Sequence, residues 1–169
     1  MVVGSVGSNS GIYTTGTIAI STLTGDLSVS QNINTQNTST TALILNASQS
    51  TVAGVSSGGD LKFSGGASIT IGANARAKLY SGSISGSTGL TTITGSGSNR
   101  FRYNSDESNS NYSLSLGAGI HAIYRERPSL TIVADDKTVT YGTAPTLTTT
   151  VNGLQNGDTA AQTLSTVAS

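Results

Sequence analysis

The chain has 169 residues and no net charge, and only 9% of the residues are charged, against about 25% in an ordinary globular domain. Glycine is frequent, with 21 residues, and β-branched residues are abundant, which favours short strands joined by tight turns over disorder. The neutral balance gives no electrostatic reason to bind nucleic acid or an anionic membrane, so no nucleic-acid partner is expected. Cysteine is absent, so stability must come from hydrogen-bonded ladders and stacked apolar rows.

Targeting signals are also missing from the sequence. No apolar run approaches the roughly 18 residues that a membrane-spanning helix needs. Residues 1–11 lack the basic and apolar regions of a secretion signal. We therefore expect a signal to lie upstream in a longer parent chain, or the chain to be a fragment of one.

Short bursts of alternating apolar residues recur along the first hundred residues. Each burst is about as long as a strand and is followed by Gly, Asn or Ser. The bursts lie at residues 17–21, 26–30, 42–45, 60–64, 68–72, 77–81, 82–86 and 90–94. Their leading leucines form the row Leu27, Leu43, Leu61 and Leu79, and a second row consists of Ile33, Val52 and Ile69.

The spacing within both rows is nearly constant and just under twenty residues. Such a period is typical of a solenoid, in which successive coils stack the same side-chain row into a continuous core. The sequence therefore predicts an all-β protein with a right-handed parallel β-solenoid. A β-sandwich of antiparallel hairpins is the alternative, because sandwiches show turn signals every 8–12 residues.

The pattern changes twice in the second half of the chain. Residues 95–112 are polar and predict a loop or an irregular coil, and residues 112–124 alternate again, which predicts the last strands of the solenoid (1–124). Residues 125–128, with the sequence RERP, are predicted to cap the terminal coil and to form a linker out of it.

Residues 129–169 predict a different module, built from antiparallel strands at 129–135, 138–142 and 146–153. Turns are expected at residues 135–137 and at Asn156–Gly157. About forty residues are too few to bury a sandwich core, so we expect this β-module to be incomplete.

Several stretches carry a family resemblance. "GDLSVSQNINT" (25–35) and "GGASITIGANARAKLYSGSISGSTGL" (65–90) resemble the passenger β-helix of bacterial exoproteins of the filamentous-haemagglutinin type. "FRYNSDES" (101–108) and "AIYRERPSLTIVADDKTVTYG" (122–142) resemble the junction between that β-helix and a partial adhesin repeat of the MBG or YDG type. The repeat is marked by Pro128, Tyr141, Gly142 and Pro145, whereas Thr143 stands where the family often has an acidic residue.

This resemblance implies a secreted protein of the bacterial cell surface that leaves the cell through an outer-membrane secretion partner. It implies adhesion to host or bacterial surface glycans or proteins, or the spacing of an adhesive tip away from the cell. It implies no cofactor and no defined ligand.

Few residues could carry chemistry. His121 is the only histidine, and no second His or Cys could complete a metal set with it. Without a Gly-x-Ser-x-Gly elbow either, a structural or surface histidine is favoured. Asp26 and Asp60 each precede a Leu and are 34 residues apart, so they could stack two coils apart like the carboxylates of β-helical polysaccharide lyases and hydrolases. A turn residue that bonds local N–H groups is the more frequent explanation. The cations that could assist such carboxylates are Lys62, Arg76 and Lys78.

Calcium binding is not favoured either. Asp106–Glu107 and Asp135–Asp136 lack the regular acidic spacing of a calcium loop. We therefore predict no metal site, no catalytic residue and no cofactor.

The predicted ligand-binding residues are Arg100, Arg102 and Tyr103, because a tyrosine ring that can stack on a sugar lies beside two cations in a polar loop. Tyr124 and Tyr141 are expected to pack at the junction of the two modules. The sequence thus predicts a structural or adhesive segment, acting as a rigid stalk or adhesin body, and not an enzyme. A polysaccharide-acting β-helix enzyme and a filament subunit that self-associates through exposed strand edges are the alternatives.

Overall fold

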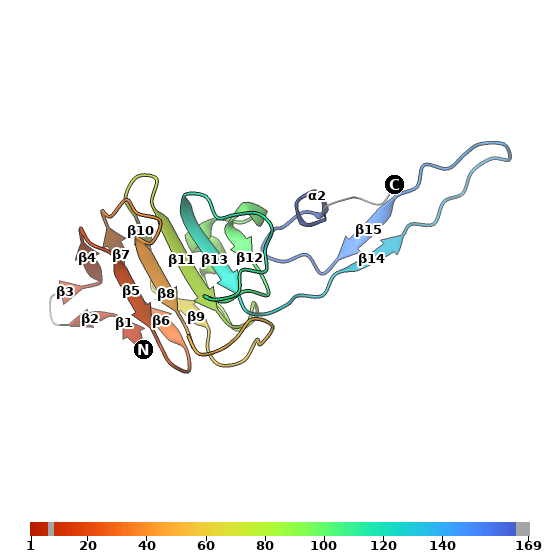
Figure 1. Cartoon of the computed structure of the whole chain (residues 1–169). Helices are drawn as coiled ribbons and strands as arrows, with labels where there is room; N and C mark the ends of the chain where they lie inside the picture. The colour runs from red at the N-terminus through yellow and green to blue at the C-terminus, as the bar shows by residue number, and fades with distance from the viewer. Residues whose placement is uncertain (7–8, 165–169) are drawn as a thin grey trace.

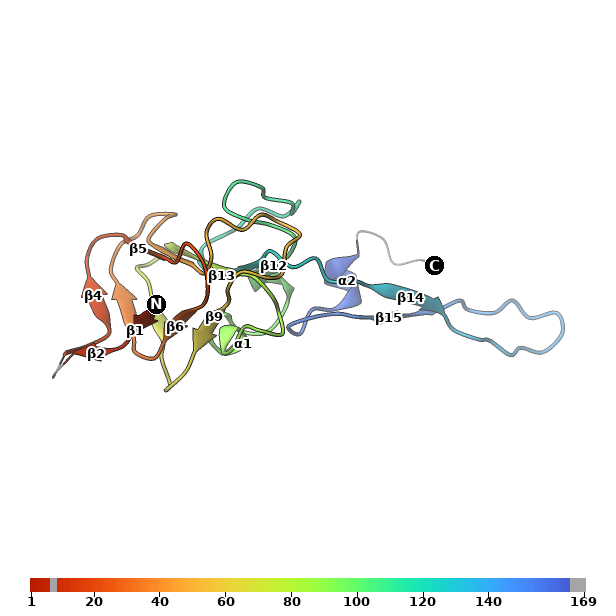
Figure 2. The ribbon, with the colours of Figure 1, turned by 90° about the horizontal axis from the view of Figure 1, so that it is seen from below.

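The structure is a computed structural model that describes residues 1–6 and 9–164. It is an all-β protein with very little helix, as the sequence predicts. Most strands lie in a compact body, and a long two-stranded hairpin extends away from one end of it (Figure 1; Figure 2 shows the same from below). No helix within the described ranges is both long and apolar enough to cross a membrane.

The body is built from short strands in three parallel sheets. Its strands are β1 (Val2–Val3), β2 (Ser5–Val6), β3 (Asn9–Ser10), β4 (Ile12–Thr14), β5 (Ile18–Ser21), β6 (Leu27–Val29), β7 (Ile33–Thr35), β8 (Leu43–Asn46), β9 (Leu61–Phe63), β10 (Ile69–Thr70), β11 (Arg76–Ser81), β12 (Phe101–Arg102) and β13 (Gly119–Tyr124). The strand orders of the three sheets are β1-β6-β9, β10-β7-β4 and β12-β13-β11-β8-β5. β2 and β3 pair separately as a small antiparallel ladder.

The chain visits the three sheets in rotation. β4, β7 and β10 belong to one sheet, β5, β8 and β11 to the second, and β6 and β9 to the third. Each strand pairs in parallel with the strand from the previous visit to its sheet. Parallel neighbours therefore arise without the helical crossovers that parallel sheets ordinarily require.

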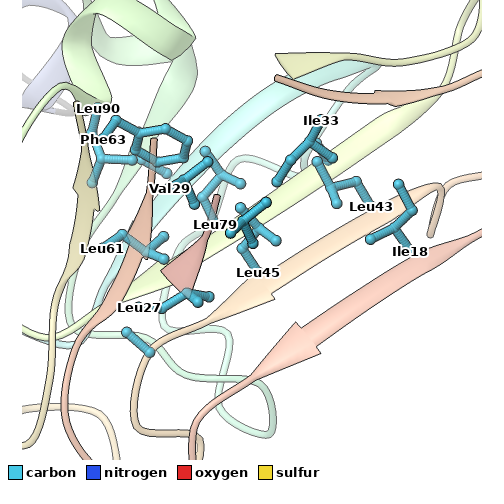
Figure 3. Packing of buried hydrophobic residues seen from close by; sticks show 14 of the residues in the cluster. Ile18, Leu27, Val29, Ile33, Leu43, Leu45, Leu61, Phe63, Leu79 and Leu90 are labelled. Atoms are coloured by element: carbon cyan, nitrogen blue, oxygen red, sulfur yellow. The ribbon is translucent and has the colours of Figure 1, made fainter. Parts of the chain in front are cut away.

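Equivalent positions in neighbouring strands stack their apolar side chains into rows inside the body. Leu27 pairs in register with Leu61, and both side chains are fully buried. Fully burying one such side chain contributes about 1.5–3 kcal/mol. The longest row crosses the five-stranded sheet and consists of Ile20, Leu45, Leu79, Ala122 and Phe101. Figure 3 shows how these rows meet in one core.

The predicted coil period is wrong. Leu27 pairs with Leu61, and Leu45 pairs with Leu79, in each case 34 residues further along the chain. The four leading leucines therefore alternate between two different sheets, and the spacing of just under twenty residues is about half a circuit. The second predicted row fails at Val52, which lies outside any strand and is 59% exposed.

Two of the eight predicted strands in the first hundred residues are also wrong. Residues 90–94 form helix α1 (Leu90–Thr94), because Leu90 and Ile93 have helical spacing and both pack against the core. Residues 82–86 contain a turn, because the Asp60 carboxylate accepts a hydrogen bond of 2.6 Å from the Ser83 N–H. The other six predicted strands are confirmed, with ends that differ by one or two residues.

The polar segment 95–112 is not simply a loop. It contains the 3-10 helix η1 (Ser98–Arg100) and β12, and β12 forms the edge of the five-stranded sheet. β13 comes later in the sequence but lies between β11 and β12 and pairs in parallel with both. The strand prediction for residues 112–124 is confirmed only from Gly119 onward.

The C-terminal segment is an antiparallel hairpin, as predicted, but it has fewer strands. β14 (Thr131–Ala134) pairs with β15 (Thr149–Asn152), and the short helix α2 (Ala160–Thr163) follows. The predicted turn at 135–137 and the strand at 138–142 are wrong, because Asp135 extends the ladder. Its N–H donates to the Thr148 carbonyl, and its carboxylate accepts from the hydroxyls of Thr148 and Thr150.

Two smaller predictions for this segment have opposite outcomes. The Asn156–Gly157 turn is confirmed, with φ angles of 51° and 80° that suit these two residues. The prediction for Tyr141 is wrong, because this side chain is fully exposed at the far turn of the hairpin loop. The domain boundaries at residues 124, 128 and 129 stay predictions.

The two ends of the five-stranded sheet differ. At one end β5 is an edge strand, beside the edge strands β1 and β4 of the other two sheets. At the other end β12 is the edge, and the C-terminal segment folds back toward it, since the Gly97 N–H donates a hydrogen bond of 2.9 Å to the Asn156 carbonyl. The C-terminal segment therefore covers part of one end of the body.

Candidate functional site

The three predicted ligand-binding residues lie together at the β12 edge of the body. Arg100 ends η1, Arg102 is in β12, and Tyr103 follows directly. Their predicted setting in a polar loop is wrong for Arg102, which is only 6% exposed and pairs with Ile123 of β13. Because β12 pairs with β13, the three side chains have different surroundings and different partners.

Tyr103 belongs to an aromatic stack. Its ring lies 5.8 Å from the Tyr124 ring at an interplanar angle of 8°, and Tyr124 in turn stacks on Phe101 at 6.3 Å. The Tyr103 hydroxyl donates a hydrogen bond of 2.7 Å to Asp158 Oδ2 and accepts one of 3.1 Å from Asn156 Nδ2. One ring face and the hydroxyl are therefore occupied by the protein itself. The prediction that Tyr124 packs at the junction agrees with this stack, in which its side chain is 1% exposed.

A pocket of about 310 Å³ lies between the end of the body and the C-terminal segment, and we call it the junction pocket. Arg102, Tyr103 and Tyr112 line it from one side, and Asp158 from the other. Burial raises the pKa of Asp158, although the Tyr103 hydroxyl and the charge of Arg102 oppose the rise. Within the described ranges, the second carboxylate oxygen of Asp158 is buried without a hydrogen-bond partner.

The outer surface of the five-stranded sheet is rich in basic residues near this pocket. Ala77 and Leu79 face the core, so alternation along β11 places Arg76 and Lys78 on the opposite, outer side. Lys78 lies in register beside His121 of β13, on the same side of the sheet. We call the set Arg76, Lys78, Arg100, Arg102 and His121 the basic face.

The basic face holds the loop of residues 114–118 by its backbone. Arg102 Nε donates to the Leu114 carbonyl at 3.2 Å, and Arg100 Nη1 donates to the Ala118 carbonyl at 2.9 Å. Arg76 donates to the carbonyls of residues 116 and 117. These bonds satisfy loop carbonyls that no strand partner satisfies, and they fix the guanidinium groups in place.

A second pocket, of about 390 Å³, opens where this loop meets the sheet. It is lined by Asn99, Arg100, Arg102, Leu114, Ser115, Gly117, Ala118 and His121. We call it the basic pocket, because its charged lining consists of two arginines.

His121 is buried in this region, which agrees with the structural alternative predicted for it and not with the surface one. Its side chain is 2% exposed, and Nε2 lies 3.2 Å from the Gly117 carbonyl. Burial lowers the pKa of His121, and the charges of Arg100 and Arg102 lower it further. Nδ1 has no hydrogen-bond partner within the described ranges.

Asp26 and Asp60 are much closer together than the predicted separation of two coils, which is therefore wrong. The Asp60 N–H donates a hydrogen bond of 2.9 Å to Asp26 Oδ1, and Lys62 Nζ lies 2.5 Å from Asp26 Oδ2. This lysine also holds the pKa of Asp26 below its ordinary value. The Asp60 carboxylate instead binds Ser83. The local turn bonds that the sequence favours for them are therefore wrong in detail, because both carboxylates bond groups more than twenty residues away in the sequence.

The first of the other acidic pairs, Asp106–Glu107, also has partners within the protein. Asp106 accepts hydrogen bonds from the backbone N–H groups of Ala53, Ser108 and Asn109 at 2.6–2.7 Å. Those bonds lower its pKa below the ordinary value, against the opposing effect of burial. In the part of the chain that the structure describes, no group of three His, Cys, Asp or Glu side chains could hold a metal ion.

The sequence does not reveal the importance of Arg125. This side chain is fully buried, although the RERP segment is predicted as a charged cap. It donates hydrogen bonds to the carbonyls of Ala47 (2.8 Å) and Thr51 (2.6 Å) and to Asn46 Oδ1 (2.6 Å), and it pairs with Glu107 at 3.3 Å. Arg125 therefore links the loop after β8 to residue 107. The sequence shows that the RERP segment is charged, but charge does not indicate which of its side chains is buried.

One comparison with known proteins bears on the C-terminal segment. Residues 130–169 match the MBG domain of the YGX type. The Tyr-Gly pair at Tyr141 and Gly142 fits that description, which leaves the third position, Thr143 in this chain, unrestricted. No curated protein and no solved structure matches the chain.

Proposed function

We propose that this chain is a structural and adhesive segment of a secreted bacterial surface exoprotein of the filamentous-haemagglutinin type. In this account the three parallel sheets form a right-handed β-solenoid that serves as a rigid stalk or adhesin body. The C-terminal hairpin is part of an MBG-type repeat.

The match of residues 130–169 to an MBG domain carries the proposal. MBG domains are generally found in surface and adhesin-type proteins, which is consistent with an adhesive role. The body supports the stalk, because the chain visits three sheets in rotation and stacks apolar rows along one axis. Stacking of that kind makes each circuit depend on its neighbours and gives an extended, quasi-one-dimensional body.

The chemistry of the carboxylates favours a binding or structural role over catalysis. A glycoside hydrolase of the usual kind needs two carboxyl groups that face a substrate, one to donate a proton and one to attack or to activate water. Here Asp26 is bonded to the Asp60 N–H and to Lys62, and Asp60 is bonded to Ser83. Both groups have structural partners, so a non-enzymatic segment is the simpler proposal.

The proposal places the protein outside the cell, with an outer-membrane secretion partner for the parent chain and with surface glycans or proteins as ligands. Beads coated with the whole chain test it. We expect these beads to adhere to bacterial or animal cells more than beads coated with serum albumin do. Equal adherence of the two kinds of bead would count against an adhesive role.

Self-association is a second candidate function, and one specific observation favours it. β1, β4 and β5 are edge strands at one end of the body, and Val2 and Tyr13 there are both 68% exposed. A pocket of about 460 Å³ opens at the same end and is lined by Val3, Ile12 and Ile20 among others. Unpaired strand edges with apolar side chains favour pairing with another chain. Analytical ultracentrifugation tests it, since a monomer at all concentrations would exclude a filament subunit.

A further inference from the structure

We propose that the basic pocket binds the oxyanion of an acidic sugar, either the carboxylate of a uronic acid or a sulfate ester. This inference rests on the proposed adhesive function and names the site and the ligand class for it. It assigns the recognition to Arg100, Arg102 and His121, which line the pocket, and to Lys78, which lies beside His121 on the basic face. Only the two arginines were expected from the sequence.

The cations of this chain are unevenly distributed over the molecule. The chain is neutral, with eight Lys and Arg and eight Asp and Glu residues. Four of the eight cations, Arg76, Lys78, Arg100 and Arg102, lie on the basic face. The acidic residues Asp26 and Asp60 belong to the β6–β9 side of the body instead. A cleft lined by one sign of charge raises the local concentration of an oppositely charged ligand.

The two arginines of the basic pocket are held in place by the backbone. Backbone bonds to residues 114 and 118 hold the two guanidinium groups in fixed positions. Within the described ranges the Arg100 guanidinium makes a single hydrogen bond, so its other N–H groups are available at the pocket. A guanidinium presents its donors in a planar fork that matches a carboxylate or a sulfate.

The remainder of the pocket lining suits a sugar. Asn99 and Ser115 provide amide and hydroxyl groups that can bond sugar hydroxyls, and Leu114, Gly117 and Ala118 provide an apolar wall. A volume of about 390 Å³ lies within the range of small-ligand sites, which is about 300–1,000 Å³. Asp158, whose negative charge acts on Arg102, lines the junction pocket and not the basic pocket. The basic pocket thus favours an anion over a cation.

Lys78 offers the cleanest test. Its side chain is half-buried on the basic face and makes no hydrogen bond or ion pair within the described ranges, so Lys78→Gln removes a charge without breaking a contact. Lys137→Gln is the matched control, because Lys137 is exposed in the loop between β14 and β15. Arg100→Gln, matched with the exposed Arg127→Gln, removes the fork itself.

The experiment measures retention of the whole chain on polygalacturonate, dextran sulfate and neutral dextran at a fixed ionic strength. We expect retention on at least one acidic polymer and none on dextran, because dextran carries no charge for the basic pocket to bind. The ionic strength is fixed because salt screens interactions between charges. Arg100→Gln should weaken that affinity about tenfold, because it removes the guanidinium and its charge-assisted hydrogen bonds. Lys78→Gln should weaken it about threefold, and both controls should leave it unchanged.

The outcomes separate this inference from the proposed function. Preference for polygalacturonate identifies the carboxylate as the ligand group, and preference for dextran sulfate identifies the sulfate. Equal retention on all three polymers, or equal weakening by the paired variants and their controls, overturns the basic pocket as the site. If coated beads still adhere to cells after such a result, the adhesive function stands and the ligand class proposed here is wrong.

Discussion

The hydroxyl of Tyr103 donates a hydrogen bond of 2.7 Å to Asp158 Oδ2 and thereby joins the end of the parallel body to the segment that matches an MBG domain. Tyr103 is itself fixed by its stack on Tyr124. Because Asn156 also bonds the same hydroxyl, the turn at residues 156–158 is held at two points. This contact is a direct link between the two parts of the chain.

Removal of that hydroxyl should release the C-terminal turn. In Tyr103→Phe the ring stack is kept, but Asp158 and Asn156 lose their shared partner, so we expect faster amide exchange at residues 156–163. The β5–β8–β11 amides should stay protected. Tyr141→Phe is the control, since Tyr141 is fully exposed. Unchanged exchange at residues 156–163 in Tyr103→Phe would show that the contact does not hold the segment.

Asp158 should make the docking depend on pH. Its folded-state pKa is raised by burial, so between the unfolded value near 3.8 and the folded value the native state binds more protons than the unfolded state does. The free energy of unfolding therefore falls as the pH rises through this window. Asp158→Asn, which can still accept from Tyr103, should lose this contribution.

Urea titrations of both proteins at pH 4 and pH 7 measure the effect. Relative to the unchanged protein, Asp158→Asn should have a higher free energy of unfolding at pH 7 than it has at pH 4. A difference that stays constant between the two values would mean that the burial of this carboxyl has no energetic consequence.

Arg125 should be among the most important side chains for stability. Arg125→Met leaves the carbonyls of Ala47 and Thr51 and the side chains of Asn46 and Glu107 without their donor. Breaking a buried pair of this kind costs about 3–5 kcal/mol. Arg127→Met, at an exposed position, should change stability by less than about 0.5 kcal/mol. Equal denaturation midpoints of the two variants would contradict the role assigned to Arg125.

The stacked rows predict a strong dependence on single core leucines. Leu45 is fully buried between Ile20 and Leu79, so Leu45→Ala should lower the free energy of unfolding by about 2–5 kcal/mol. Leu147→Ala is the control, since Leu147 is 64% exposed in the hairpin loop. Chemical denaturation monitored by circular dichroism measures both variants, and a small effect at Leu45 would argue against a packed core.

The hairpin should be less stable than the body. All four residues of β14 are exposed, including Ile132 and Val133 at 50% and 48%, and a two-stranded sheet is marginal in water. Amides of β14 and β15 should therefore exchange faster than those of β8 and β11. Equal protection in the two parts would contradict this prediction.

The sequence predicts the strands well wherever alternation is strict. Leu27, Leu43, Leu61 and Leu79 all begin or lie within real strands, because period-two alternation reports a strand with one buried side. It could not show which strands are neighbours. Leu27 and Leu43 belong to different sheets. Only the register of distant strands shows that the spacing of just under twenty residues spans about half a circuit of the three sheets and not a whole one. Residues 90–94 fail for a local reason, since Leu90 and Ile93 also fit a helix.

The candidate site is only partly visible in the sequence. Arg100, Arg102 and Tyr103 attract attention as neighbours, but their side chains take different roles once β12 pairs with β13. Lys78 lies beside His121 only because two strands more than forty residues apart are in register. Long-range pairing of this kind leaves no mark in local composition, and the same applies to the burial of Arg125.

The most direct test of the account is retention of the whole chain on a panel of bacterial and host polysaccharides, with new reducing or unsaturated ends measured in the same samples. The account predicts retention without any increase in such ends. An increase in ends would contradict it and would direct attention to Asp26, Asp60 and Lys62 as catalytic groups.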